Sequence, residues 1–158
     1  MLKITIIASD APDAVTAAQT LRSRYGEDPA ATADVVVALG GDGLMLQALH
    51  AYMNTGKPIY GMNRGSVGFL MNEYRPDELM ERLAAAKTET IHPLATSVRL
   101  SDERVVSARA VNEVSMLRQS YQAAKLRVTV DGQVRLEELI CDGLLLATPA
   151  AAPPTTTR

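Results

Sequence analysis

The spacing of apolar residues changes character near residue 91 of this chain. Before it, short apolar runs alternate with segments whose apolar residues recur every three or four positions, the pattern of strands alternating with helices. After it, helical spacing ends and only short runs typical of strands follow. Residues 1–90 are therefore predicted to form a Rossmann-like α/β domain on a parallel sheet, and residues 91–149 an incomplete antiparallel all-β domain.

The first domain is predicted to contain strands at residues 2–8, 35–39 and 58–62, each followed by a helix. The run at 35–39, VVVAL, has no polar alternation, so it is expected to be buried on both faces in the middle of the sheet. Ser9 or Asp10 is expected to cap the first helix, which contains Pro12 in its first turn and ends at Gly26.

The second domain is predicted to be built from short strands only. They are expected at residues 96–100, 104–110, 111–118, 125–130, 133–136 and 144–148. Asp131-Gly132 is a strong hairpin signal. So few strands leave open sheet edges, which are a pairing hazard. Residues 150–158 carry no apolar side chain larger than alanine or proline and are expected to be a disordered tail.

A glycine-rich turn, GGDG at residues 40–43, directly follows the buried strand and precedes a helix that includes Leu44, Met45 and Leu49. Ligands bind at the carboxyl ends of parallel strands, and helix N-termini favour anions such as phosphate. The turn has neither the Lys-Ser/Thr pair of a P-loop nor G-x-G-x-x-G spacing. Two interpretations stay open: a phosphate site with the Asp42 carboxylate beside it, or a tight turn in which Asp42 caps the helix.

A second glycine-rich loop, NRGSVGFL at residues 63–70, follows the third strand. Parallel strand order would place it beside the first turn. Arg64 is either a phosphate contact or a solvated loop arginine.

Composition narrows the class of protein. Hydrophobic residues make up 47% of the 158-residue chain, and the net charge of −2 comes from dispersed charges, which argues against a nucleic-acid surface or a polybasic membrane surface. No apolar run approaches a membrane span and no signal peptide is recognised, so a cytoplasmic protein is expected. Cys141 is the single cysteine and is expected to be an inert buried thiol. His50 and His92 lack metal-ligand spacing.

Four motifs in order resemble the NAD kinase family, in its alphaproteobacterial form. They are GGDG at 40–43, NRGSVGFL at 63–70, the pair Asn112-Glu113, and DGLLLATP at 142–149. The GGDG turn also occurs in diacylglycerol kinases and a related turn in phosphofructokinases, so a similar N-terminal fold is implied. The two later motifs favour NAD kinase over both.

The resemblance implies an enzyme, a phosphotransferase that moves the γ-phosphoryl group of ATP to the 2′-hydroxyl of the adenosine ribose of NAD, making NADP. Asp42 would be the general base and would help to hold the ribose or a metal ion. Mg²⁺ would bridge the phosphates, with no dedicated set of protein ligands assigned to it. The partners would be NAD and ATP, in a family whose members are usually homo-oligomers.

The resemblance also implies a set of nucleotide-binding residues. Backbone N–H groups of the two glycine loops would hold phosphates, Asn112 and Glu113 would bind adenine and ribose, Asp142 would accept from a ribose hydroxyl, and Ala150 would line the NAD pocket. The complete predicted set is Asp42, Gly43, Asn112, Glu113, Asp142, Ala150, Gly40, Gly41, Asn63 and Gly65.

The chain departs from the family after Ala150, where GSTAY is expected and AAPPTTTR follows. The codons GGC AGC ACC GCC TAC AAC encode GSTAYN, and shifted by one base they give AAPPTT, as at residues 151–156. The hypothesis is a C-terminally truncated, frameshifted reading frame, which resequencing of the gene tests. A chain of 158 residues is then expected to be poorly soluble with little kinase activity. The alternative function is a non-catalytic nucleotide-binding fragment, an inactive remnant of an NAD kinase.

Overall fold

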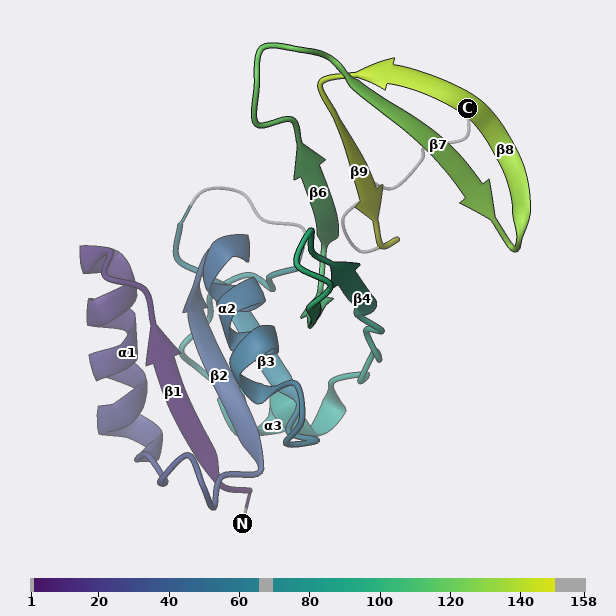
Figure 1. Cartoon of the computed structure of the whole chain (residues 1–158). Coiled ribbons are helices and arrows are strands. Elements are labelled where there is room, and N and C mark those ends of the chain that lie inside the picture. The colour runs from purple at the N-terminus through teal and green to yellow at the C-terminus, as the bar shows by residue number, and fades with distance from the viewer. Residues whose placement is uncertain (1, 66–69, 150–158) are drawn as a thin grey trace, which may run out of the picture. The chain divides into compact units, whose positions relative to one another are not determined.

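A computed structural model describes residues 2–65 and 70–149 (Figure 1). The chain divides into two compact units, residues 1–90 and residues 91–158. Each unit is described by itself below.

The first unit is a three-stranded parallel sheet with helices between its strands (Figure 1). In chain order its elements are β1 (Ile4–Ala8), α1 (Pro12–Tyr25), β2 (Val35–Gly40), α2 (Asp42–Tyr52), β3 (Ile59–Asn63) and α3 (Leu79–Ala85). The sheet order is β1-β2-β3, and both pairings are parallel. The predicted parallel α/β fold is confirmed, and the two glycine-rich segments follow neighbouring strands.

The core of this unit lies on both faces of β2, whose six residues are all buried. Val35, Val37 and Leu39 pack in one cluster with residues of α1 and α3. On the other face, a Cβ built at Gly61 of β3 would collide with the Met45 side chain of α2. Helices therefore cover both faces, which explains why the run from Val35 has no polar alternation.

The start of α1 differs from the prediction. Its N-cap is Ala11, which makes no side-chain capping bond, and Pro12 is the first helical residue. Neither Ser9 nor Asp10 caps the helix, because both precede the N-cap position. The Ser9 N–H instead donates to the carbonyl of Leu39, at 3.0 Å, and so extends the strand pairing. The predicted end of the helix is confirmed, since Gly26 is its C-cap with φ +75°, a conformation that glycine adopts at little cost.

β1 is an edge strand of the sheet, and carboxylates from the loop after α1 accept hydrogen bonds from its outward-facing N–H groups. The Ile6 N–H donates to Glu27 at 3.0 Å and the Ile4 N–H to Asp28 at 3.3 Å. Arg22 holds Glu27 in place through a bond of 2.6 Å between Nε and Oε2. These side chains satisfy edge donors that would otherwise be open to pairing with another chain.

The Glu27 contacts predict a pH-dependent contribution to stability. The hydrogen bond from Arg22, assisted by the Ile6 N–H, lowers the pKa of Glu27 below its ordinary value of 4.5. A lowered folded pKa means that this stabilisation is present above about pH 4.5 and is lost as the pH falls through the folded value. Glu27→Gln is expected to lower the urea midpoint at neutral pH and to flatten its acid dependence. Glu81→Gln, at an exposed position of α3, is the control; an equal effect of both substitutions would contradict the assignment.

The second unit consists of antiparallel strand pairs. Its strands are β4 (Leu94–Arg99), β5 (Val105–Ala110), β6 (Glu113–Leu117), β7 (Ala124–Val130), β8 (Gln133–Cys141) and β9 (Gly143–Ala147). β4 pairs with β5, β6 with β9, and β7 with β8. Asp131 and Gly132, with φ of 51° and 75°, form the predicted hairpin turn between β7 and β8. β8 is longer than predicted and continues to Cys141. Cys141 is only partly buried, so the expectation of a buried thiol is wrong.

Apolar side chains of the second unit are largely exposed. Thr148 is the only buried residue among those described in this unit. The exposed large apolar side chains are Val98, Val105, Val106, Met116, Leu117, Tyr121, Val130, Val134, Leu136, Ile140, Leu145 and Leu146. Patches of this kind mark interaction surfaces or association hazards.

Leu117 gives the simplest test of that hazard, since it is 82% exposed near the end of β6. Leu117→Lys is expected to raise the soluble concentration and reduce self-association, because a charge interrupts an exposed apolar strand edge. Static light scattering against protein concentration measures the change. Val15→Lys, at a position 41% exposed on α1, is the matched control. Equal improvement by the two lysines would show a general charge effect instead.

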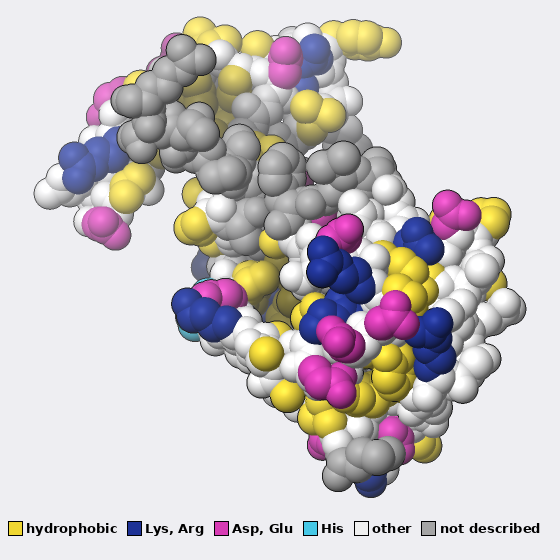
Figure 2. All heavy atoms as spheres, turned by 180° about the vertical axis from the view of Figure 1, so that it is seen from behind, with side chains coloured by type: hydrophobic (Ala, Val, Ile, Leu, Met, Phe, Trp, Pro, Cys, Tyr) yellow, Lys and Arg dark blue, Asp and Glu magenta, His cyan; other side chains and the backbone are white. Residues whose placement is uncertain are grey.

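Charge is dispersed over the surface seen in Figure 2, where basic side chains lie next to acidic ones. Ion pairs account for part of this mixing, for example Arg24 with Asp77 and Arg104 with Asp102. None of the helices described in the structure combines the length and apolar character needed to cross a membrane.

Candidate functional site

The GGDG turn joins the centre of the sheet to α2. β2 ends at Gly40, and Gly41 is the N-cap of α2 without a side-chain capping bond. The N–H groups of Leu44 and Met45 both donate to the Gly41 carbonyl, at 3.1 and 3.2 Å. Asp42 is thus the first residue inside the helix, and the interpretation of Asp42 as a helix cap is wrong.

The second glycine loop is held at both of its described ends. After β3, the Asn63 side chain accepts from the Gly65 N–H at 2.9 Å, which closes a tight turn. The chain returns at Asn72, whose carbonyl accepts from the Asn63 N–H at 2.8 Å and whose N–H donates to Gly61 at 2.9 Å. Residues 66–69 of the predicted loop lie outside the described residues.

Direct contacts bind the two turns together. The Arg64 N–H donates to the Gly40 carbonyl at 2.8 Å. The Leu70 N–H donates to Oδ1 of Asp42 at 3.1 Å and so helps to fix the carboxylate. A Cβ built at Gly65 would lie 3.4 Å from the Gly41 nitrogen, so the close approach of the two backbones favours glycine at position 65.

Six of the predicted site residues therefore lie together at the carboxyl ends of β2 and β3. They are Gly40, Gly41, Asp42, Gly43, Asn63 and Gly65. The first turn of α2 presents N–H groups without acceptors in the helix, and the helix dipole favours an anion there. A Cβ built at Gly43 would meet no atom within 4 Å, so space is open beside this turn. The arrangement can hold a phosphate next to a fixed carboxylate.

In the second unit, Asn112 and Glu113 stand at the junction of β6 and β9. Glu113 pairs with Ala147, and the Asn112 carbonyl accepts from the Thr148 N–H at 2.7 Å. The Thr148 hydroxyl donates to the Val111 carbonyl at 2.7 Å. The side-chain oxygen Oδ1 of Asn112 is buried and has no hydrogen-bond partner within the described part of the chain. Such an orphaned acceptor calls for a donor from outside the described part of the chain.

Asp142 lies at the opposite end of the same strand pair, beside the Leu117–Gly143 pairing. It lies five residues along the strand pair from the Glu113–Ala147 pairing, about 16 Å, so these predicted ligands are not neighbours. Its carboxylate accepts from Nε of Arg118 at 2.6 Å, and the Arg118 N–H donates to its carbonyl at 2.9 Å. Ala150 lies outside the described residues.

Sequence reasoning missed three residues that position the site: Leu70, Thr148 and Arg118. Leu70 acts through its backbone N–H, and Thr148 through both its backbone N–H and its hydroxyl, and no residue pattern reveals these contacts. Arg118 is a polar residue at the end of a predicted strand, and only the β6–β9 pairing shows that it meets Asp142. No group of three metal-ligating side chains occurs within residues 2–65 and 70–149.

Comparison with known proteins identifies relatives of this chain. The family model described as ATP-NAD kinase N-terminal domain matches residues 9–91. The NAD kinase of Brucella suis biovar 1 is 56% identical over 151 residues, which cover 96% of this chain and 59% of the relative. The NAD kinase of Caulobacter vibrioides is 53% identical over 150 residues, covering 95% and 58%.

The fold has a counterpart among solved structures. The crystal structure of yeast NADH kinase complexed with NADH matches with a TM-score of 0.79 at 18% identity, over 96% of this chain and 58% of that one. At this identity the match concerns the fold alone. The chain spans somewhat less than three fifths of the length of these relatives. Because the family model covers more than half of it, the chain belongs to the NAD kinase family.

Proposed function

We propose that this chain carries the catalytic carboxylate and part of the substrate-binding surface of an NAD kinase that converts NAD to NADP with ATP. The observation that carries the proposal is the pairing of the two glycine turns around Asp42, with Leu70 and Arg64 bonding across them. Relatives called NAD kinase at 56% identity support the choice of substrates. A cytoplasmic location is part of the same proposal.

Asp42 is the proposed general base. Its carboxylate takes the proton of the 2′-hydroxyl of the adenosine ribose of NAD as that oxygen bonds to the γ-phosphorus of ATP. The bond from the γ-phosphorus to the bridging oxygen breaks, and ADP leaves. The Leu70 N–H, 3.1 Å from Oδ1, restrains the carboxylate and so limits the orientations from which it accepts the proton. Positioned bases contribute roughly 10²–10⁴ in rate.

The rest of the rate enhancement is proposed to come from positioning of phosphates. The first turn of α2 and the close-packed backbones of Gly41 and Gly65 form the phosphate cradle. Mg²⁺ commonly binds one or two carboxylates together with substrate phosphates and water. Asp42 fits that mode, and the ion would neutralise phosphate charge when bound.

Acceptor binding is proposed for the second unit. The orphaned Oδ1 of Asn112 suits the amino group of adenine, a donor that would satisfy it. Glu113 is exposed at the start of β6 and can accept from ribose hydroxyls. Asp142 is held by Arg118 at 2.6 Å, so its carboxylate is oriented before a ligand arrives.

A second candidate function is a non-catalytic nucleotide-binding fragment. The large exposed apolar surface of the second unit, including Leu117, Leu145 and Leu146, favours it. In that case the glycine turns of the first unit would bind nucleotide without turnover.

One assay separates these functions. The purified chain is incubated with ATP, Mg²⁺ and NAD, and NADP is quantified by mass spectrometry, with diacylglycerol as an alternative acceptor. NADP formation that requires ATP supports the kinase. Nucleotide binding without product supports the fragment, and phosphorylated diacylglycerol without NADP overturns the proposed acceptor.

A further inference from the structure

Asn72 lies two residues after Leu70, whose N–H fixes the Asp42 carboxylate, and it makes three hydrogen bonds to β3. Its side-chain Nδ2 and its backbone N–H both donate to the Gly61 carbonyl, at 3.0 and 2.9 Å. Its own carbonyl accepts from the Asn63 N–H at 2.8 Å. A single residue thus ties the chain that carries Leu70 to the strand that ends at the second glycine turn.

The packing around Gly61 brings this tether close to the sheet. A Cβ built at Gly61 would collide with Sδ of Met71, the residue between Leu70 and Asn72. Met62, the next residue of β3, forms a parallel β-bridge with Asn72. Residues 71 and 72 therefore lie directly against β3, and glycine at position 61 permits this close approach.

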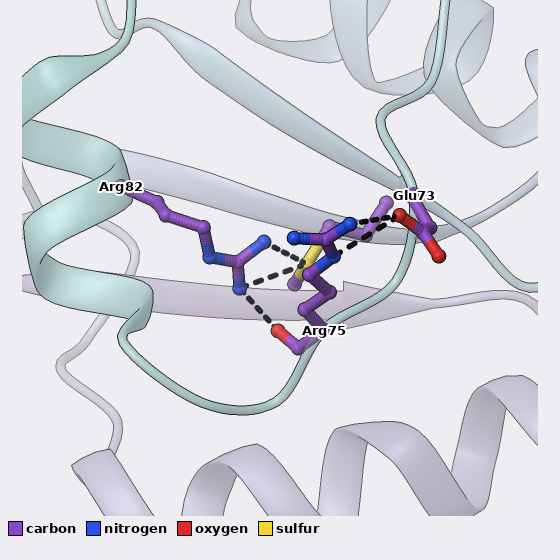
Figure 3. Close-up of polar contacts among 4 residues, drawn as sticks. Glu73, Arg75 and Arg82 are labelled. Carbon is purple, nitrogen blue, oxygen red and sulfur yellow. Dashed lines mark hydrogen bonds and ion pairs between the residues drawn. The ribbon is translucent and has the colours of Figure 1, made fainter.

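The far end of the same segment is held by separate contacts. Figure 3 shows Arg82 of α3 donating to the Arg75 carbonyl. The Tyr25 hydroxyl of α1 donates to the next carbonyl, that of Pro76, at 2.9 Å. These contacts lie beyond Asn72 along the chain, so Asn72 is the tether nearer to the glycine turns.

We propose that Asn72 is a positioning residue, which holds the Leu70 N–H where it restrains the Asp42 carboxylate. This inference rests on the proposed kinase function and deepens it. A general base must lie within hydrogen-bond reach of the proton that it takes, and a displacement of about 1 Å can cost roughly 10²-fold in rate. Because the Leu70 N–H bonds to Oδ1 at 3.1 Å, a loosened Leu70 lets the carboxylate turn away from the productive orientation.

The direct test follows the amide signal of Leu70 by NMR in the isotope-labelled full chain. Asp42→Asn alone is expected to shift this signal, because the N–H then donates to a neutral oxygen instead of a carboxylate. In an Asn72→Ala background, which lacks the Nδ2 bond to Gly61, the same substitution is expected to shift the signal much less, because Leu70 is no longer held on that oxygen. This readout requires no turnover.

Kinetics supply the second readout. Asn72→Ala is expected to lower the kcat for NADP formation about 10- to 10²-fold and to change the KM for NAD less than about twofold, because the orientation of the base is lost and binding is not. Tyr25→Phe is the matched control, since it keeps the ring but removes the hydroxyl that bonds to Pro76 and Leu79 at the far end of the segment. It is expected to lower the urea midpoint while kcat and the Leu70 signal stay unchanged. An equal fall in kcat for the two variants would show general loosening of the segment and overturn the proposal.

A measurement on the unsubstituted chain guards against a misfolded variant. The N–H groups of Leu70 and Asn72 are expected to exchange with deuterium at similar rates, since one local opening exposes both. Fast exchange at Leu70 with protection at Asn72, or an undiminished response of Leu70 to Asp42→Asn in a folded Asn72→Ala chain, would overturn the proposal. A response that depends on Asn72, in a chain that binds ATP and NAD but forms no NADP, would refute the proposed kinase function and leave the assignment of Asn72 standing.

Discussion

Asp42→Asn is expected to reduce NADP formation on the order of 10²–10⁴-fold, the usual contribution of a general base. Asparagine has nearly the shape of aspartate, so its carbonyl can still accept from the Leu70 N–H and the packing of the two turns should survive. It cannot take the proton of the attacking hydroxyl. The kcat for NADP measures the loss, and circular dichroism checks the fold.

The Asp42 substitution has a second readout that needs no turnover. Removing a negative charge beside the phosphate site is expected to strengthen binding of ATP in the absence of metal, because like-charge repulsion is relieved. Asp10→Asn, an exposed aspartate on the loop before α1, is the control. A kcat within about tenfold of the unsubstituted chain would rule out Asp42 as the base.

Leu21→Ala is expected to destabilise the first unit by about 2–5 kcal/mol, the range for truncating a buried leucine. Leu21 is fully buried on α1 and belongs to the cluster that joins this helix to the sheet. Such a loss is a large share of the roughly 5–15 kcal/mol by which folded domains are usually stable. The urea midpoint, followed by far-ultraviolet circular dichroism, measures it.

Val15→Ala is the matched control for Leu21→Ala. Val15 lies on the same helix but is 41% exposed, so shortening it leaves no cavity and is expected to change the midpoint little. Comparable shifts for the two variants would mean that α1 is not anchored to the sheet through Leu21.

The hydrophobic pattern and the glycine turn signals were sufficient to predict most of the fold. The run from Val35 specified a strand buried on both faces because its apolar residues do not alternate. Gly26 specified the end of α1, and Asp131-Gly132 the β7–β8 hairpin, because both places need positive φ. These features depend on local physics, which a residue and its neighbours carry with them.

The sequence by itself also determined the family, through four motifs in order, and the carboxyl ends of two strands as the candidate site. Only the tertiary structure decided how Asp42 is held: the Leu70 N–H, 28 residues away, reaches its carboxylate, while Gly41 takes the cap position. It also decided that Asp142 is held by Arg118 at one end of β6–β9, with Asn112 and Glu113 at the other. The physical reason is that backbone donors and strand register are set by contacts between distant segments, and such contacts leave no periodic trace in the chain.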